Sequence, residues 1–142
     1  MAATDLTAFV EDVVHEPTQT EGEGFDLTVA DVYEVAAPGR IDFGGGELEA
    51  AETVPHDSHK RDPDDDYEWW SLSAGQYLLA FNESLTGEAT VTVQPRTELL
   101  ERGATHPTLH VEELPRVPFS VGGAGLKLKE NARVSTIVAA DT

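Results

Sequence analysis

Short stretches of alternating apolar and polar residues, bounded by glycine, proline and other turn residues, dominate this sequence. The pattern is clearest in residues 89–93 (Ala-Thr-Val-Thr-Val) and in residues 117–121 (Val-Pro-Phe-Ser-Val). A period of two puts successive side chains on opposite faces of a β-strand, whereas the apolar residues of a helix recur every three or four positions. The sequence therefore predicts an all-β fold of mostly antiparallel strands, either a sandwich or a barrel.

The expected strands cover most of the chain. They lie at residues 25–29, 32–35, 40–43, 69–72, 75–81 and 89–93, with at least two more between residues 117 and 138. A 3–4 apolar spacing predicts a short amphipathic helix over residues 6–14, although Val13 and Val14 equally suit the start of a strand. We expect a single domain over residues 1–142, with an N-terminal segment (1–18) and an acidic loop (53–67).

Residues 94–103 predict a strand that ends and opens a short helix. Pro95 lacks a ladder donor, so the strand should end there. Thr97 is able to cap free backbone N–H groups, and Gly103 suits a left-handed helix end. Arg96 and Thr97 at a helix N-terminus favour an anion, whereas Glu98 and Glu101 in the same helix oppose one.

The chain is strongly acidic, with 27 Asp and Glu against 9 Lys and Arg and a formal net charge of -18. Such a charge opposes binding to DNA, RNA or an anionic membrane. Because the acidity is spread along the chain and lysine occurs only at positions 60, 127 and 129, we expect a halophilic protein that needs salt to screen its self-repulsion. There is no cysteine, no apolar run long enough to span a membrane and no basic start at Met1, so we expect a cytoplasmic protein without disulfides or thiolate metal sites.

Three other features have alternative interpretations. The glycines at 44–46 lack the lysine and hydroxyl residue of a phosphate-binding loop, which favours a flexible turn. The loop over residues 53–67 carries His56, His59 and four aspartates, which form a solvated loop or, as the alternative, a metal loop. The tandem tryptophans at 69 and 70 pack in the core or a subunit interface, or else stack on a nucleobase.

Five motifs occur in one order with plausible gaps. They are Gly24-Phe25-Asp26-Leu27-Thr28-Val29; Gly39-Arg40-Ile41-Asp42-Phe43; Leu72 and Gly75 with Tyr77, then Phe81-Asn82-Glu83; Pro95-Arg96-Thr97 through Gly103-Ala104; and Lys129 with Asn131-Ala132-Arg133-Val134. Over roughly residues 19–138 the chain resembles the dUTPase and dCTP deaminase family, in particular its archaeal branch. The resemblance implies a distorted jelly-roll-like barrel of the β-clip type, a homotrimer with active sites between subunits, and Mg²⁺ with deoxynucleoside triphosphates as ligands.

The resemblance assigns roles to three of these residues. Asp26 matches the aspartate that holds the metal and the triphosphate through water, although bonding within a turn is an equal alternative. Arg96 and Thr97 match the family's Pro-Arg-Ser, in which the arginine organises the catalytic segment and the hydroxyl bonds a bridging phosphate oxygen. If Arg96 were instead buried in an ion pair with its neighbouring acids, its phosphate role would fall.

The chain also departs from the family pattern. Glu98 replaces a small residue, and Glu101 stands where a second arginine is usual, with Arg102 displaced by about 100° around the helix. The two acids either bind metal or adapt an exposed helix to salt. The family's base-binding hairpin, expected between Gly103 and Asn131, is shortened, and Glu112 or Glu113 is left as a substitute water-activating base or as part of a charged turn. We expect His106 and His110 at the surface or an interface.

Three further differences from the family pattern bear on which reaction the resemblance implies. Deamination is disfavoured because the position of the family's deaminase glutamate, close to Phe119, is apolar. The glutamine of the last motif and the glycine-rich C-terminal lid are also missing. The resemblance thus implies hydrolysis of dUTP to dUMP and diphosphate. The alternative is a catalytically inactive trimeric protein that binds nucleotides or has a structural role.

Overall fold

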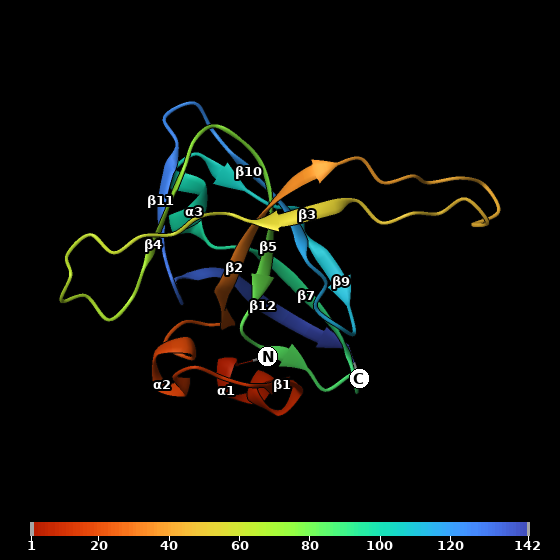
Figure 1. The fold of residues 1–142 in the computed structure, drawn as a ribbon. Helices are drawn as coiled ribbons and strands as arrows, with labels where there is room; N and C mark the ends of the chain where they lie inside the picture. Colours follow the sequence, from red (N-terminus) through yellow and green to blue (C-terminus); the bar gives the residue numbers. More distant parts are fainter. Residues whose placement is uncertain (1, 142) are drawn as a thin grey trace.

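The computed structural model describes residues 2–141, and a curled β half-barrel dominates it (Figure 1). The short helical elements are α1 (Ala3–Leu6), η1 (Thr7–Phe9), α2 (Glu16–Gln19) and α3 (Thr97–Glu101). The strands are β1 (Val10–Glu11), β2 (Phe25–Ala37), β3 (Glu52–Pro55), β4 (Trp69–Leu72), β5 (Gly75–Phe81), β6 (Ser84–Leu85), β7 (Thr90–Pro95), β8 (Ala104–Thr105), β9 (Leu109–Val111), β10 (Val117–Val121), β11 (Leu126–Lys129) and β12 (Arg133–Asp141). The prediction of an all-β fold with few short helices is confirmed.

One large sheet runs in the order β8-β10-β5-β2-β12-β7-β9, with β3 added on β2, and its pairings are antiparallel. Two small sheets, β1-β6 and β11-β4, complete the pairing within residues 2–141. Strand β12 therefore lies between β2 and β7, although the three strands are far apart in sequence. This neighbourhood brings residues of the first, fourth and last of the five motifs onto one surface.

Two clusters of buried side chains form the core. One contains Val29, Trp70, Leu79 and Phe119 among others, and the second contains Phe25, Leu27, Val91, Val93 and Ile137. Strand β7 contributes to the second cluster through its alternation, since Val91 and Val93 are fully buried while their neighbours along the strand are not. Burial of side chains of this size, at about 1.5–3 kcal/mol each, is the main term that holds the sheet closed.

Several predicted boundaries are wrong for identifiable reasons. Residues 25–29 and 32–35 belong to one strand, since an irregularity between Val29 and Asp31 shifts the register without ending β2. The predicted helix over residues 6–14 is instead α1, the single turn η1 and strand β1, which pairs with β6. The polar stretch after it contains α2, where Pro17 occupies the first turn of the helix.

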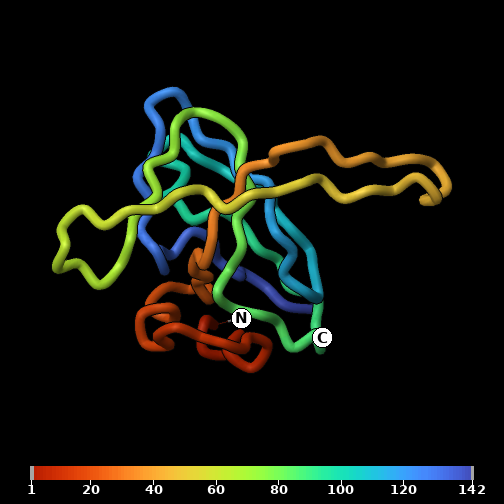
Figure 2. Tube along the Cα trace, in the orientation of Figure 1, coloured from red at the N-terminus to blue at the C-terminus, as the bar shows by residue number. Residues whose placement is uncertain are grey.

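The segment between β2 and β3 was predicted to hold a strand at residues 40–43, but only one bridge forms there, between Arg40 and Glu49. Residues 38–51 instead make a long hairpin, called the arm below, that projects from the body of the molecule (Figure 2). Gly44–46 forms the turn at its tip, where the Asp42 carboxylate accepts hydrogen bonds from the backbone N–H groups of Gly45 and Glu47, both at 3.1 Å. The acidic loop is also shorter than predicted, because residues 53–55 belong to β3.

Among residues 2–141, no helix combines the length and the apolar character that crossing a bilayer requires.

Candidate functional site

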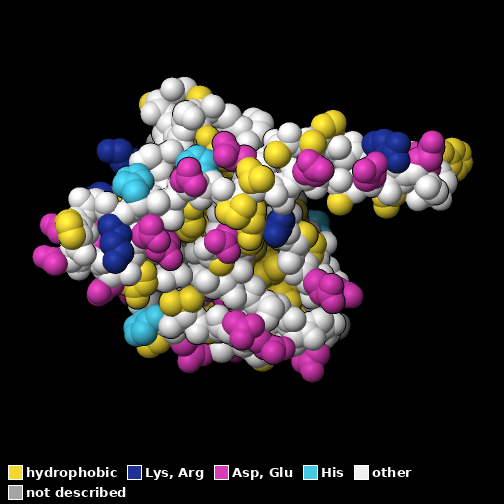
Figure 3. All heavy atoms as spheres, in the orientation of Figure 1, with side chains coloured by type: hydrophobic (Ala, Val, Ile, Leu, Met, Phe, Trp, Pro, Cys, Tyr) yellow, Lys and Arg dark blue, Asp and Glu magenta, His cyan; other side chains and the backbone are white. Residues whose placement is uncertain are grey.

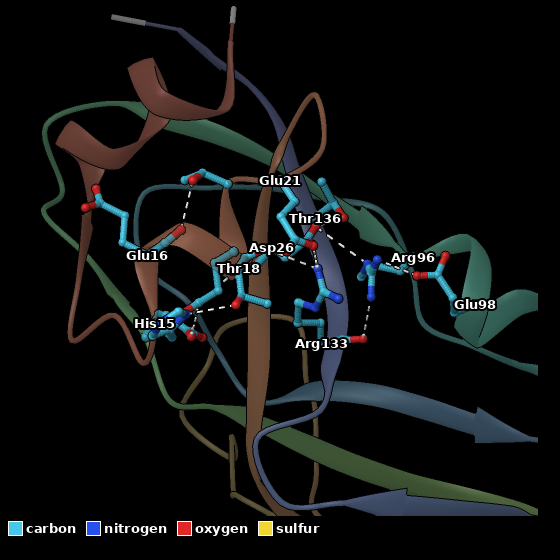
Figure 4. Close-up of polar contacts among 12 residues, drawn as sticks. His15, Glu16, Thr18, Glu21, Asp26, Arg96, Glu98, Arg133 and Thr136 are labelled. Atoms are coloured by element: carbon cyan, nitrogen blue, oxygen red, sulfur yellow. Dashed lines mark hydrogen bonds and ion pairs between the residues drawn. The ribbon is translucent and has the colours of Figure 1, made fainter.

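An open cleft of about 530 Å³ lies where the beginning of β2, the end of β7 and the beginning of β12 meet. Its walls are Glu21, Gly22, Glu23, Gly24, Asp26, Gln94, Pro95, Arg96, Thr97, Glu98, Arg133, Thr136 and Val138. Three of the five residues for which the resemblance predicts a role, Asp26, Arg96 and Thr97, are among them. Figure 4 shows the charged side chains of this cleft converging from β2, β12 and the start of α3.

Asp26 is the centre of the cleft's polar contacts and is 5% exposed. Its carboxylate accepts a hydrogen bond from Arg133 Nη1 at 3.1 Å and another from Thr136 Oγ1 at 2.9 Å. Arg96 Nε lies 3.6 Å from the carboxylate. The strand register causes this arrangement, since Asp26 stands directly opposite Thr136 in the β2–β12 pair.

Arg96 follows β7 and stands at the cap position of α3, with its side chain 19% exposed. Besides Asp26, its guanidinium forms an ion pair with Glu98 and donates to the carbonyl oxygen of Arg133 at 3.4 Å. Both neighbouring acids are therefore paired with Arg96, but its side chain is only partly buried and lines the cleft, so the condition predicted to remove its phosphate role is met only in part. About half of the Glu98 side chain is in water, whereas the Asp26 side chain is buried.

Arg133 is a second guanidinium in the same cleft. It donates to Asp26, to the carbonyl oxygen of Thr18 at 3.2 Å and to Glu21 Oε2 at 3.4 Å. The sequence marked Arg133 only as part of a motif and Thr136 only as a departure from one. Neither was assigned to the site, because the β2–β12 pairing that brings them to Asp26 joins residues about a hundred positions apart.

Thr97 is exposed and forms the first turn of α3. The prediction that it caps the helix is wrong, because Arg96 holds the cap position and no side chain hydrogen-bonds to the free N–H groups there. Its hydroxyl is thus left at the rim of the cleft. Gly103 follows the helix with φ of 83°, the left-handed conformation that was predicted for it.

Glu112 and Glu113 lie far from this cleft within one protomer. Both are exposed and follow β9, whose residue Val111 pairs with Val91 of β7. Arg96 lies five residues beyond Val91, which corresponds to roughly 17 Å along an extended strand. A carboxylate from this pair reaches the cleft only if a second copy of the chain supplies it.

A buried polar network supports the backbone behind Asp26. Gln19 donates its side-chain amide to the carbonyl oxygen of Asp26 at 2.9 Å and to the Glu83 carboxylate at 2.8 Å. Glu83 also accepts from the backbone N–H of Thr28 at 2.9 Å and from its hydroxyl at 2.6 Å. Burial raises the pKa of Glu83, and these hydrogen bonds act against the rise.

His106 is buried, 4% exposed, so the prediction of a surface position is wrong for it. Its Nδ1 lies 2.8 Å from the carbonyl oxygen of Pro107 and its Nε2 lies 2.6 Å from the Ser135 hydroxyl. Since a carbonyl only accepts, Nδ1 carries the proton and Ser135 donates to Nε2. Burial lowers the pKa of His106. His110, in contrast, is exposed and bonds Thr92 across the β7–β9 pair at 2.9 Å.

The structure also places the histidines of the acidic loop and the tandem tryptophans, for which the sequence left alternatives open. The rings of His56 and Tyr77 pack edge to face, and the backbone of His59 forms a β-bridge with Trp69; among residues 2–141 neither histidine belongs to a group of three or more side chains able to hold a metal ion. Trp70 is in the core, whereas Trp69 lies between the cations of Arg61 and Lys129, at 4.1 and 5.6 Å from its ring centre.

The residues of the cleft do not fit a tightly held metal ion. Within residues 2–141, no group of three or more His, Cys, Asp or Glu side chains is arranged to hold one. The Asp26 carboxylate is already occupied by two arginines and a threonine hydroxyl. A contact between Asp26 and Mg²⁺ through water stays a prediction.

Comparison with known proteins finds three relatives of one kind. The chain is 27% identical over 136 residues to a probable deoxyuridine 5'-triphosphate nucleotidohydrolase of Methanosarcina acetivorans, a match that covers 91% of this chain and 76% of the relative. It is 26% identical to the protein of the same name from Methanosarcina mazei over the same shares. A third, from Methanococcoides burtonii, is 25% identical over 100 residues, which are 68% of this chain and 54% of that protein. No protein-family model matches the chain.

These relatives support a dUTPase-like family. Their identity to the chain is modest, and the all-β fold described above agrees with that family.

Proposed function

We propose that the chain is a dUTPase-like nucleotide hydrolase that binds the triphosphate of a deoxynucleoside triphosphate in the cleft around Asp26. The observation that carries the proposal is the convergence of two guanidiniums, those of Arg96 and Arg133, on the floor of an open cleft with the free Thr97 hydroxyl at its rim. Guanidinium groups hold phosphate oxygens through paired N–H donors. The three dUTPase-named relatives support the same substrate class.

In this proposal the exposed acids act as temporary partners of the arginines. Glu98 and Glu21 are 51% and 62% exposed in their side chains, so each turns into water when a phosphate takes its place on Arg96 or Arg133. Asp26 is held by three contacts and stays, which keeps both guanidiniums oriented. Thr97 bonds a bridging phosphate oxygen. Mg²⁺ enters bound to the triphosphate and offsets part of its charge.

Hydrolysis requires a base that activates a water. We assign this role to Glu112 or Glu113 of a neighbouring copy, since the two residues are distant from Arg96 within one protomer. The carboxylate accepts a proton from the water, and the oxygen of that water forms a bond to the α-phosphorus. The bond between the α-phosphorus and the bridging oxygen breaks, and diphosphate leaves. Deamination remains disfavoured because Phe119 is fully buried in the core.

The second candidate is a non-catalytic protein that kept the scaffold, whether it binds nucleotides or has only a structural role. Its support is the pairing of Arg96 with Asp26 and Glu98, which satisfies the guanidinium without any ligand. In that case the cleft is an internal ion-pair cluster, and its arginines stabilise the β2–β12–β7 junction.

The deciding experiment measures diphosphate release from dUTP, dCTP and dTTP by the purified protein in molar KCl with Mg²⁺. Release from dUTP that is lost in both Arg96→Ala and Glu112→Gln/Glu113→Gln supports the hydrolase. A rise in melting temperature with dUTP but no release supports a nucleotide-binding protein. Neither release nor a shift leaves the structural role, and the proposed triphosphate site is then wrong.

A further inference from the structure

All 27 acidic side chains of the chain lie within residues 2–141, and only two of them are buried. These two are Asp26 and Glu83, which are 5% and 4% exposed. The other acids keep contact with water, and Figure 3 shows them spread over one face of the molecule. Gln19 joins the buried pair, since its amide donates to the backbone carbonyl oxygen of Asp26 at 2.9 Å and to the Glu83 carboxylate at 2.8 Å. Because removing a carboxylate from water is costly, two connected exceptions point to a common role.

Gln19 and Glu83 replace a strand partner at the beginning of β2. Strand β5 pairs with β2 only from Val29 onward. Before that point, Gln19 bonds the carbonyl oxygen of Asp26. The Glu83 carboxylate accepts from the backbone N–H of Thr28 at 2.9 Å. A buried backbone group without a partner costs as much as a lost hydrogen bond, so these side chains fix the part of β2 that carries Asp26.

The Gln19 amide has one orientation that satisfies its neighbours. Its oxygen accepts from the backbone N–H of His15 at 2.7 Å, and its nitrogen faces two acceptors, a carbonyl oxygen and a carboxylate. Reversing the amide would place its oxygen against both acceptors. Gln19 is 1% exposed, so water cannot replace the bonds that such a reversal would break. The amide therefore holds the backbone of Asp26 in one position.

Glu83 suits this junction because an ionised carboxylate only accepts hydrogen bonds. Besides the Gln19 amide, it accepts from the backbone N–H of Thr28 and from the Thr28 hydroxyl at 2.6 Å. Within residues 2–141, no basic side chain forms an ion pair with it, and burial raises its pKa. Its charge is thus held by hydrogen-bond donors. A glutamine in its place would point N–H groups at those donors.

Helix α2 extends the same network to Arg133. The carbonyl oxygen of Thr18 accepts from Arg133 Nη1 at 3.2 Å, and that nitrogen is also 3.1 Å from the Asp26 carboxylate (Figure 4). Gln19 is the next residue of α2 and its buried one. A helix of four residues is not stable by itself, so α2 depends on contacts of this kind for its position. Gln19 therefore holds both members of the ion pair, Asp26 through its backbone and Arg133 through Thr18.

We propose that Gln19 and Glu83 are positioning residues of the triphosphate site. Glu83 orients the Gln19 amide, and Gln19 in turn places Asp26 and Arg133. Neither Gln19 nor Glu83 lines the cleft, so both act through other residues. A guanidinium must be held in a fixed geometry to bond phosphate oxygens through paired donors. The inference rests on the proposed function, since it concerns how the same cleft holds a triphosphate.

Calorimetry with dUTP and Mg²⁺ in molar KCl tests the role on the folded protein. Gln19→Met keeps the length of the side chain and removes both N–H donors, and we expect it to weaken dUTP binding about tenfold because Arg133 loses its fixed position. The matched control is Val32→Ala, a buried residue on the same strand and roughly 20 Å along it from Asp26. The control leaves a cavity and should lower the melting temperature without changing the Kd of dUTP.

Inorganic tripolyphosphate gives a second measurement. It lacks the nucleoside, so Gln19→Met should weaken its binding by the same factor as that of dUTP if the change acts on the arginines. A loss with dUTP alone contradicts the positioning role. Should Gln19→Met not fold, Thr28→Val takes its place, because it removes one donor to Glu83 and keeps the shape of the side chain. It should bind both ligands more weakly than Val32→Ala does.

The outcomes separate this inference from the proposed function. If the unmodified chain binds both ligands and Gln19→Met binds them no more weakly than Val32→Ala, the network is structural alone. The positioning role is then wrong, whereas the triphosphate site stands. If the unmodified chain binds neither ligand, the triphosphate site itself is wrong, and the positioning role falls with it.

Discussion

Replacing Asp26 by Asn tests whether the centre of the cleft is an ion-pair cluster held by a single carboxylate. The change removes one negative charge and keeps the shape of the side chain. Arg133 and Arg96 then lose their shared partner and face each other as two like charges in a partly buried place. We expect a less stable protein.

The magnitude follows from the distances. At 3.1 and 3.6 Å, each ion pair corresponds to about 5 kcal/mol at an effective dielectric of 20 and to about 1 kcal/mol in bulk water. The side chains of Asp26, Arg96 and Arg133 are 7%, 19% and 29% exposed, so screening places the pairs between these limits. Because the amide oxygen of the substituted side chain still accepts one hydrogen bond, we expect a loss of about 2–3 kcal/mol in dilute salt and less in molar salt.

The assay is thermal unfolding followed by circular dichroism in dilute and molar KCl. For a chain of this length, a loss of about 2 kcal/mol lowers the melting temperature by roughly 5–8 °C. The matched control is Glu101→Gln, which removes one exposed carboxylate from an acidic surface and should leave the melting temperature unchanged or slightly higher.

One result refutes the ion-pair reasoning directly. If Asp26→Asn melts no lower than Glu101→Gln in dilute salt, the two arginines do not depend on Asp26. A cycle with Arg133→Gln adds a check, since residues in contact should show a coupling free energy of about 1 kcal/mol or more, and strict additivity would contradict the contact.

Three further predictions concern pH, charge and salt. His106 has a lowered pKa in the folded state, so below its ordinary pKa of 6.5 the unfolded chain binds more protons than the folded chain. The free energy of unfolding therefore falls as the pH falls, by up to about 1.4 kcal/mol per pH unit. Urea unfolding of the unmodified chain and of His106→Gln should show pH dependences that diverge, and parallel curves would contradict the lowered pKa. Glu98→Gln removes an acidic partner of Arg96 and should tighten dUTP binding several-fold, as measured by calorimetry. Weaker binding in this variant would exclude competition by the Glu98 carboxylate. Glu101→Arg should tighten dUTP binding only if that position faces the phosphate. With a formal net charge of -18, the chain should lose melting temperature on dialysis from molar to millimolar KCl, and a temperature independent of salt would exclude salt adaptation.

The strands that alternate cleanly were predictable because their signal is local. Residues 69–72 and 75–81 match β4 and β5, and Gly103 follows α3 in the left-handed conformation that its lack of a side chain allows. The continuous strand β2 was not predictable as one element. Its irregularity after Val29 shifts the alternation, and only pairing with β5 carries the strand across that point.

The division between local patterns, which the sequence shows, and long-range contacts, which it does not, also applies to the cleft. Asp26, Arg96 and Thr97 were found because each belongs to a short motif, whereas the contacts that decide their chemistry join β2, β7 and β12. His106 was predicted at the surface or an interface, since a lone histidine in a polar stretch carries no sign of burial in the core. Its partner Ser135 lies on β12, and no local pattern connects the two.

The amino-acid sequence by itself determined the all-β class, the acidic composition and three of the residues that line the cleft, Asp26, Arg96 and Thr97. Those properties depend on side-chain alternation, on composition and on short motifs, each of which is read within a few residues. Only the tertiary structure decided that Arg96 and Arg133 share Asp26, that Glu112 and Glu113 lie far from them within one protomer, and that the arm stands free with its apolar side chains in water. The physical reason is that ion pairing and burial depend on which strands become neighbours, and that choice is made by the packing of the whole sheet.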